Sequence, residues 1–173
     1  MRIAYADPPY LGQCLRYGHQ HDGYGCWDRP ETHLGLLKKL VEGFPDGWAL
    51  SCSSPSLRLL LPATPPDTRA GAWVKPLAMF KPNVWPAYAW EPVLFRGGRR
   101  GSRTADTPFD WCMESMRNGS PILGAKPPGF CSWVLRLLGY EEGDEIVDMF
   151  PGTGVMSLVA AQGTLPLHAE LGK

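Results

Sequence analysis

One stretch of the sequence decides the fold: residues 145–154 read EIVDMFPGTG, and residues 155–162 continue as VMSLVAAQ. The first six residues predict a strand, the Pro-Gly-Thr-Gly run predicts a tight turn, and the apolar run after it predicts a helix. Glycines in such a turn let the backbone pass close to a ligand at the end of the strand. The stretch therefore predicts either a nucleotide-type cofactor site or an ordinary strand-to-helix turn with glycine at the tight positions.

A final strand is expected over residues 165–171, with the acidic Glu170 near its end. A carboxylate at that place can accept hydrogen bonds from two ribose hydroxyls. The glycine turn lacks the Gly-Lys-Ser/Thr of a phosphate-binding loop and the third glycine of a dinucleotide fingerprint. A neutral adenosyl ligand therefore suits this pattern better than a pyrophosphate.

A second turn follows the first expected strand, residues 2–6, and reads Asp7-Pro8-Pro9-Tyr10. The prolines end the strand and make the corner rigid. Asp7 and the Pro8 carbonyl would present two acceptors side by side, which suits an exocyclic amine with two N–H groups. The ring of Tyr10 offers a flat face on which a base could stack. The other interpretation is a turn that caps the strand, with Tyr10 packed in the core.

Strands and helices alternate along the rest of the chain. Further strands are expected over residues 47–52, 72–75, 92–96 and 145–150, and helices over 31–44, 55–61, 129–138 and 155–162. Residues 96–120 are polar and are expected to form a loop with at most a short helix. The alternation predicts one α/β domain over residues 1–173, built around a largely parallel sheet.

The composition is that of an ordinary folded domain, with 44% hydrophobic and 20% charged residues among 173. The 17 basic and 17 acidic residues cancel, which excludes a wholly basic nucleic-acid coat and an acidic tail. No apolar run reaches the roughly 18 residues of a membrane span, and the N-terminal sequence predicts no signal peptide. Five scattered cysteines without a CxxC pair favour reduced thiols in a cytosolic protein.

Together the two turns resemble the motifs of the S-adenosylmethionine (SAM)-dependent amino-methyltransferases of nucleic acids, specifically the N6-adenine DNA methyltransferases. The family's catalytic motif is Asp-Pro-Pro-Tyr/Phe/Trp, here residues 7–10, and its SAM motif is Asp-x-Phe-x-Gly-x-Gly, here residues 148–154. The catalytic motif comes first, as in the permuted β-class enzymes of restriction-modification systems and phages. The Glu-Pro strand over residues 90–95 and the Lys126-Pro127 pair also resemble family segments.

The resemblance spans nearly the whole chain and implies its fold, a circularly permuted and minimal Rossmann-like methyltransferase sheet flanked by helices. The implied catalytic residues are Asp7, Pro8, Pro9 and Tyr10. Asp7 and the Pro8 carbonyl would hold the adenine N6 amine, and Tyr10 would stack on a base flipped out of the DNA duplex. The implied SAM-binding residues are Asp148, Phe150, Gly152, Thr153, Gly154, Glu170 for the ribose, and Lys126 near the methionine carboxylate.

The implied chemistry is direct in-line methyl transfer with neither a covalent enzyme intermediate nor a metal, and it depends on orientation in a dry pocket. Asp rather than Ser at position 7 favours adenine N6 over cytosine N4. Methylation of RNA or of cytosine N4 by the same geometry remains an alternative, as does a non-catalytic module that binds SAM or nucleic acid. The implied location is the cytoplasm of a bacterial, archaeal or phage-infected cell.

Residues 96–125 are all that is available for target recognition, which takes many tens of residues in the family. Arg96, Arg99, Arg100 and Arg103 lie there in a glycine-rich run, RGGRRGSR. The run predicts contact with DNA phosphates, and a solvated loop is the alternative. One small subunit offers little surface with which to grip a duplex, and this favours a homodimer.

The segment over residues 11–30 has no periodicity and is expected to be a long loop near the site. Its Tyr24 and Trp27 either contact bases or pack to hold the loop shut. Four residues of metal-ligand type form a symmetric C-x4-H-x-H-x4-C set: Cys14, His19, His21 and Cys26. This spacing matches no familiar zinc finger, so no metal is expected.

Overall fold

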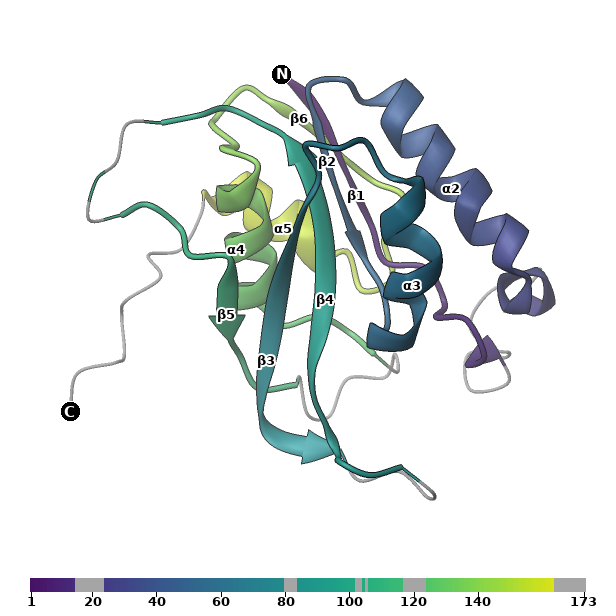
Figure 1. Ribbon diagram of the computed structural model, residues 1–173. Coiled ribbons are helices and arrows are strands. Elements are labelled where there is room, and N and C mark those ends of the chain that lie inside the picture. The colour runs from purple at the N-terminus through teal and green to yellow at the C-terminus, as the bar shows by residue number, and fades with distance from the viewer. Residues whose placement is uncertain (15–23, 80–83, 102–103, 105, 117–123, 164–173) are drawn as a thin grey trace.

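The structure of the chain is a computed structural model, which describes residues 1–14, 24–79, 84–101, 104, 106–116 and 124–163. The described residues form a six-stranded sheet in the order β5-β3-β4-β2-β1-β6 (Figure 1). The strands are β1 (Arg2–Ala6), β2 (Gly47–Ser51), β3 (Arg69–Met79), β4 (Tyr88–Gly97), β5 (Trp111–Met113) and β6 (Glu145–Asp148). The α-helices are α2 (Pro30–Gly43), α3 (Leu57–Leu60), α4 (Pro128–Leu137) and α5 (Val155–Gln162), and the 3-10 turns are η1 (Tyr24–Asp28), η2 (Ser54–Ser56) and η3 (Leu61–Ala63).

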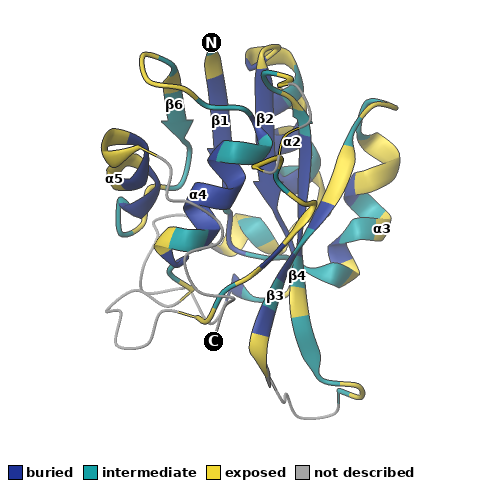
Figure 2. Cartoon of the chain, turned by 90° about the vertical axis from the view of Figure 1, so that its left-hand side faces the viewer, coloured by how far each residue is buried: buried dark blue, intermediate teal, exposed yellow. Residues whose placement is uncertain are grey.

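The helices cover both faces of the sheet (Figures 1 and 2). Helices α4 and α5 pack on the face that carries Ile3 and Tyr5 of β1. Helices α2 and α3 pack on the other face, which carries Ala4 and Ala6. Since successive side chains of a strand point to opposite faces, one central strand contributes to both hydrophobic layers, and no residue of β1 after Arg2 is exposed.

The sheet is mixed, and the expectation of a largely parallel sheet holds only in part: three of its five strand pairings are parallel. Strand β1 pairs in parallel with β2 and β6, but β4 is antiparallel to both of its neighbours, β2 and β3. The reason is the connection between β3 and β4, residues 80–87. Parallel neighbours need a crossover of about a dozen residues or more, so a connection this short forms an antiparallel hairpin.

Residues 96–120 also differ from expectation, because β5 lies within them. It pairs in parallel with β3, Ala72 facing Trp111 and Val74 facing Met113. Of its residues Cys112 is buried and Trp111 and Met113 are exposed. Three residues are too few to produce a recognisable alternation in the sequence, which is why this edge strand was not predicted.

The remaining elements follow the sequence closely. The helix expected over 155–162 is confirmed, and those expected over 31–44 and 129–138 each begin and end one residue earlier. The helix expected over 55–61 is instead a succession of short turns, η2, α3 and η3. The strand expected over 165–171, with Glu170, lies outside the described residues. Among the helices that are described, none is long and apolar enough to cross a membrane.

Candidate active site

The two turns singled out in the sequence lie next to each other at one edge of the sheet. Strands β1 and β6 are parallel neighbours, with Tyr5 facing Asp148. Parallel strands end at the same edge, so Asp7 follows β1 beside the point where Asp148 ends β6. Chain segments that leave neighbouring strands in different directions open a crevice at this edge, which is where α/β sheets bind ligands.

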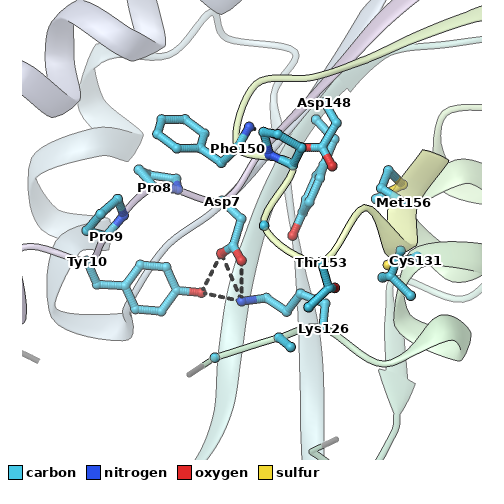
Figure 3. A pocket seen from close by; sticks show the side chains of 16 residues that line it. Asp7, Pro8, Pro9, Tyr10, Lys126, Cys131, Asp148, Phe150, Thr153 and Met156 are labelled. Carbon is cyan, nitrogen blue, oxygen red and sulfur yellow. Dashed lines mark hydrogen bonds and ion pairs between the residues drawn. The ribbon is translucent and has the colours of Figure 1, made fainter. Parts of the chain in front are cut away.

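A cleft is present between the two turns (Figure 3). Most of the site residues expected from the sequence line this cleft: Asp7, Pro8, Pro9, Tyr10, Lys126, Asp148, Phe150, Gly152 and Thr153. Tyr5, Cys131 and Met156 line it as well and were missed, because in the sequence they look like ordinary core positions. Burial raises the pKa of the Cys131 thiol to about 12, so this cysteine stays protonated at neutral pH and is no nucleophile.

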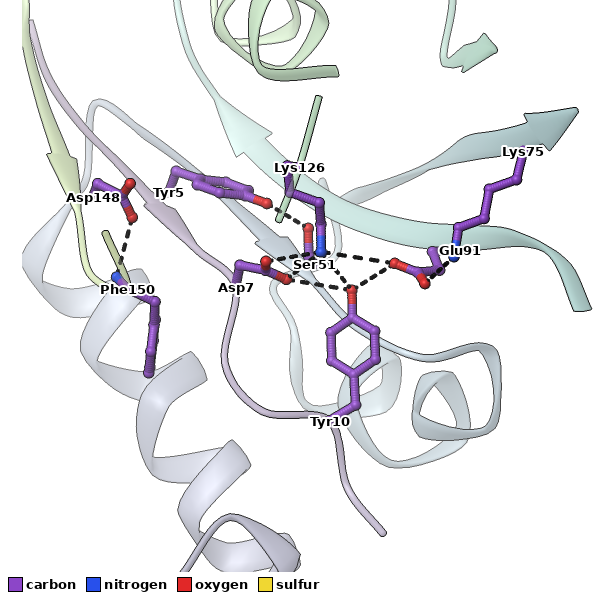
Figure 4. Close-up of polar contacts among 9 residues, drawn as sticks. All are labelled: Tyr5, Asp7, Tyr10, Ser51, Lys75, Glu91, Lys126, Asp148 and Phe150. Atoms are coloured by element: carbon purple, nitrogen blue, oxygen red, sulfur yellow. Dashed lines mark hydrogen bonds and ion pairs between the residues drawn. The ribbon is translucent and has the colours of Figure 1, made fainter. Parts of the chain in front are cut away.

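Asp7 is held by Lys126, which precedes α4 (Figure 4). The ammonium nitrogen of Lys126 lies 2.8 Å from each carboxylate oxygen of Asp7. The Lys126 side chain is 8% exposed and the Asp7 side chain 19%. Lys126 was expected near the methionine carboxylate of a cofactor, whereas here its charge is paired with the carboxylate of the catalytic motif.

Tyr10 joins this pair to a second carboxylate. Its hydroxyl donates a hydrogen bond of 2.8 Å to Glu91 on β4 and lies 3.3 Å from both Asp7 and Lys126. Glu91 also forms an ion pair with Lys75 of β3. The network therefore contains two ammonium groups, two carboxylates and one phenol, contributed by β3, β4 and the segments after β1 and before α4.

Lys75 and Glu91 were not expected in the site. Glu91 belongs to the Glu-Pro strand that resembles the family, but no role was assigned to it. Lys75 is the only charged residue of the strand expected over residues 72–75, and a buried lysine requires a partner. That isolated charge was the signal in the sequence that could have revealed it.

Burial and charge set the protonation of this network. Burial raises the pKa of Asp7, and the neighbouring Lys126 ammonium opposes this rise. Burial also acts to raise the pKa of Glu91, but the ammonium groups of Lys126 and Lys75 outweigh it and leave that pKa lowered. Burial and the charge of Glu91 raise the pKa of Tyr10 well above its usual value. At neutral pH Tyr10 is therefore a donor and Glu91 an ionised acceptor.

The glycine turn has the backbone that its sequence requires. Gly152 and Gly154 have φ angles of 48° and 71°, a region that residues with a Cβ rarely adopt. A Cβ at Gly154 would meet nothing within 4 Å, and one at Gly152 would meet only the Phe150 carbonyl oxygen at 3.8 Å. Asp148 accepts a hydrogen bond of 3.1 Å from the Phe150 amide. The two glycines therefore leave open space beside the backbone, where other residues would place a side chain.

The segment over residues 11–30 is described only in part. The ring of Trp27 packs edge-on against that of Phe150, with centroids 5.2 Å apart, and against that of His33, with centroids 5.4 Å apart. Trp27 therefore packs against the residue that comes just before the glycine turn. Tyr24 begins η1. Cys14 is buried and Cys26 exposed, while His19 and His21 lie outside the described residues. Within the described ranges no three residues of metal-ligand type come together.

The arginine-rich run is not brought to this edge of the sheet. Arg96 faces Trp48 near the beginning of β2, and Trp48 in turn faces Ala4, three residues before Asp7. Arg96 forms a 2.7 Å ion pair with Asp67, and Arg99 pairs with Asp144 at 3.0 Å. Arg100 is exposed beside them, and Arg103 lies outside the described residues. Contact of these arginines with DNA remains a prediction.

No family model and no curated protein matches the chain. Among solved structures the chain is similar to M1.HpyAVI in complex with SAM, with a TM-score of 0.54, 13% identity, and 93% of this chain and 77% of that chain covered. It is also similar to M1.HpyAVI without the cofactor, with a TM-score of 0.54, 11% identity, and 93% and 74% covered. At such low identity the likeness establishes the fold alone, which this chain shares with M1.HpyAVI.

Proposed function

We propose that this chain transfers a methyl group from SAM to the N6 amine of an adenine in DNA. One observation carries the proposal: the Asp7–Tyr10 turn and the Asp148–Gly154 turn, from opposite ends of the sequence, border one cleft at the carboxyl ends of neighbouring parallel strands. A base site and a cofactor site must adjoin for a direct transfer, because the reacting atoms have to come within about 3.5 Å. The methyltransferase fold supports the same reading.

The glycine turn fits SAM as a cofactor. It leaves open space at Gly152 and Gly154, where backbone can approach a ligand, and Phe150 and Met156 supply apolar walls to the cleft. SAM, when bound, supplies an electrophilic methyl group. The residues that would hold it are Asp148, Phe150, Gly152, Thr153, Gly154 and, beyond the described part of the chain, Glu170.

The Asp-Pro-Pro-Tyr turn fits an adenine amine. An ionised Asp7 and the Pro8 carbonyl would accept its two N–H bonds and so turn the nitrogen lone pair away from them, toward the cofactor side of the cleft. Pro8 and Pro9 are buried, which keeps these acceptors in place. The hydrogen bond from Tyr10 to Glu91 fixes the ring on which a flipped base would stack.

The proposal treats residues 1–173 as one methyltransferase domain in permuted motif order, with residues 96–125 as the DNA-contact segment. Along the strands Arg96 is level with Ala4, three residues or about 10 Å before Asp7, and Arg99 lies farther away, paired with Asp144 before β6. A duplex that reaches both Asp7 and Arg99 must span the sheet, or a second copy in a homodimer must supply the arginines. Sedimentation of the protein with and without duplex DNA distinguishes the two arrangements.

The test of the function is a tritiated-methyl transfer assay with SAM on unmethylated duplex DNA, with RNA of equal length in parallel, followed by nucleoside mass spectrometry. We expect N6-methyladenine in DNA. Label in RNA or at cytosine N4 would correct the acceptor but keep the reaction class. Binding of SAM without transfer to either polymer would overturn the enzyme and favour a binding module.

A further inference from the structure

An ammonium group occupies the place at which the proposed substrate must bind. The Lys126 nitrogen contacts both carboxylate oxygens of Asp7 at 2.8 Å, and one of these oxygens would accept an N–H bond of an adenine amine. An amine that approaches Asp7 therefore competes with Lys126 for that oxygen. A shift of Lys126 away from Asp7 leaves the oxygen to the base.

The buried position of Lys126 limits where it can go. Its side chain is 8% exposed, and a buried ammonium without a counter-ion is strongly unfavourable. A second carboxylate must therefore lie within reach. Glu91 fulfils this condition, because its Oε2 is 3.8 Å from the Lys126 nitrogen, only about 1 Å beyond ion-pair contact distance.

Glu91 is also kept available for this second contact (Figure 4). Lys75 pairs with its Oε1 from the other side, so Glu91 remains ionised while Lys126 is on Asp7. The Tyr10 hydroxyl lies 3.3 Å from Lys126 and 2.8 Å from Glu91, between the two positions. A short rotation of the flexible lysine side chain exchanges one carboxylate for the other without a change in net charge.

We propose that Glu91 is a positioning residue for methyl transfer. It accepts the Lys126 ammonium when the target amine replaces that ammonium on Asp7. It also holds Tyr10 in place through the hydrogen bond from the Tyr10 hydroxyl. This inference rests on the proposed function, because it takes an amine of the substrate as the group that enters at Asp7. It assigns Lys126 to the base side of the cleft.

The exchange has a signature in the pH profile. The groups that act on Asp7 are Lys126, which lowers its pKa, Glu91, which raises it, and Tyr10, whose hydrogen bond lowers it. Two further titratable groups interact with Asp7: Asp148 at the end of β6 and Tyr5 on β1. The pKa values of both Asp148 and Tyr5 are raised, chiefly by burial and in part by the charge of Asp7. Removing the charge of Glu91 therefore lowers the pKa of Asp7, and removing that of Lys126 raises it.

The first experiment measures methyl transfer by Glu91→Gln, which keeps an acceptor for the Tyr10 hydroxyl but removes the charge that receives Lys126. We expect kcat/KM for DNA to fall about ten- to hundredfold, SAM affinity to stay within about twofold, and the acid limb of the rate profile to move to lower pH. The matched control is Glu145→Gln, the same change at an exposed ion pair with Arg2, which should leave the rate unchanged.

A double-mutant cycle with Lys126→Met tests the exchange itself. Lys126→Met alone should move the acid limb to higher pH and remain active above it. In that background Glu91→Gln should cost less than about threefold, because no ammonium is left to receive. If Glu91→Gln alone fails to fold, Lys126→Met by itself still tests the inference, through the expected move of its acid limb to higher pH and its activity above that limb.

The exchange is overturned if Glu91→Gln binds SAM and turns over like the wild type, if its cost is the same with and without Lys126, or if Lys126→Met is inactive at every pH. Each of these results requires wild-type protein that methylates a nucleic acid. A wild type that transfers no methyl group overturns the proposed function instead, so the two failures are distinguishable.

Discussion

The two edges of the sheet both carry paired charges, but the pairs differ in burial. At the carboxyl edge the side chains of Lys126 and Lys75 are each 8% exposed in their pairs with Asp7 and Glu91. At the opposite edge the Arg2–Glu145 pair is 54% and 60% exposed, whereas Asp144, which pairs with Arg99 there, is 5% exposed and Arg99 is 35% exposed. Exposed pairs exchange readily with water and contribute about 0–1 kcal/mol each, whereas a buried charge is strongly destabilising without its partner.

This difference separates a dense run of charges in the sequence from a preorganised site. The arginine run, residues 96–103, contains the most concentrated positive charge in the chain, yet Arg96 and Arg99 are already paired with carboxylates. The charges of the cleft are scattered along the sequence and are brought together only by the sheet. Their burial holds them in one arrangement, which is the condition for orienting a substrate.

The largest effect is expected from Asp7→Ala, which removes the acceptor for the target amine. Turnover should fall about 10²- to 10³-fold, as for loss of a positioned polar group in other active sites. SAM affinity, measured by calorimetry, should change less than about twofold because Asp7 lies on the base side of the cleft. A variant with near-normal turnover would show that the buried network is structural only.

The next effect concerns the pH dependence at the carboxyl edge. The pKa of Asp7 is raised above its ordinary value, chiefly by burial, and the ionised form is the stronger acceptor for an N–H bond of the target amine. Single-turnover rates should therefore decline as the pH falls, with a midpoint above the value of about 3.9 for a free aspartate. A midpoint at or below that value would contradict the assignment of Asp7 as the acceptor.

Substitution in the glycine turn should affect both stability and cofactor binding. Gly154→Ala places a Cβ at a φ of 71° and should lower the free energy of unfolding by about 1 kcal/mol, with weaker SAM binding. Gly163→Ala is the matched control, since Gly163 ends the same helix with a φ of 79°. It should show at least as large a loss in thermal unfolding, because its ψ of 159° lies in a region nearly restricted to glycine, but normal SAM affinity. Equal losses of affinity would argue against the cofactor turn.

Asp144→Asn tests a carboxylate at the opposite edge of the sheet. Arg99, the N-terminal ammonium and the Glu141 amide hold the pKa of Asp144 well below its usual range, so its contribution to stability is present above about pH 4 and is lost as the pH falls through the lowered value. At neutral pH the variant should unfold about 2–4 °C lower, with normal turnover. The difference from wild type should shrink in acid, and a loss of activity would place this edge in the site.

The smallest effect is expected for Glu145→Gln, which breaks an exposed ion pair. The free energy of unfolding, measured by urea titration, should change by no more than about 0.5 kcal/mol. A larger change would mean that exposure does not distinguish the two edges as described above.

The pattern of the sequence predicted most elements because each is decided by residues close to one another. On α2, the side chains of Leu36, Leu37 and Leu40 recur at helical spacing and are buried in the hydrophobic core. Gly152 likewise marks the turn after β6. Strand β5 and the antiparallel hairpin were not predicted, since strand pairing depends on contacts between distant segments. The residues around Trp111 show no alternation of apolar and polar side chains that would indicate its pairing with Ala72.

The candidate site divides in the same way. The residue types of its two turns were evident, because an acidic group followed by prolines, or by glycines, has few uses at the end of a strand. The partners of those residues were not evident, since Lys75 and Glu91 come from β3 and β4, which β2 separates from β1, and they meet Lys126 and Asp7 only in the folded sheet. Lys126 was found by resemblance, but its contact with Asp7 was not.

The sequence by itself determined where strands end in turns able to bind an amine or an adenosyl group, because turn chemistry and periodicity are local properties of the chain. Only the tertiary structure decided that the two turns share one cleft, that Lys126 and Glu91 flank Asp7 there, and that Arg99 lies at the opposite edge, paired with Asp144. The physical reason is that burial, which fixes these charges and shifts their pKa values, depends on strand order and direction, and these are properties of the whole sheet.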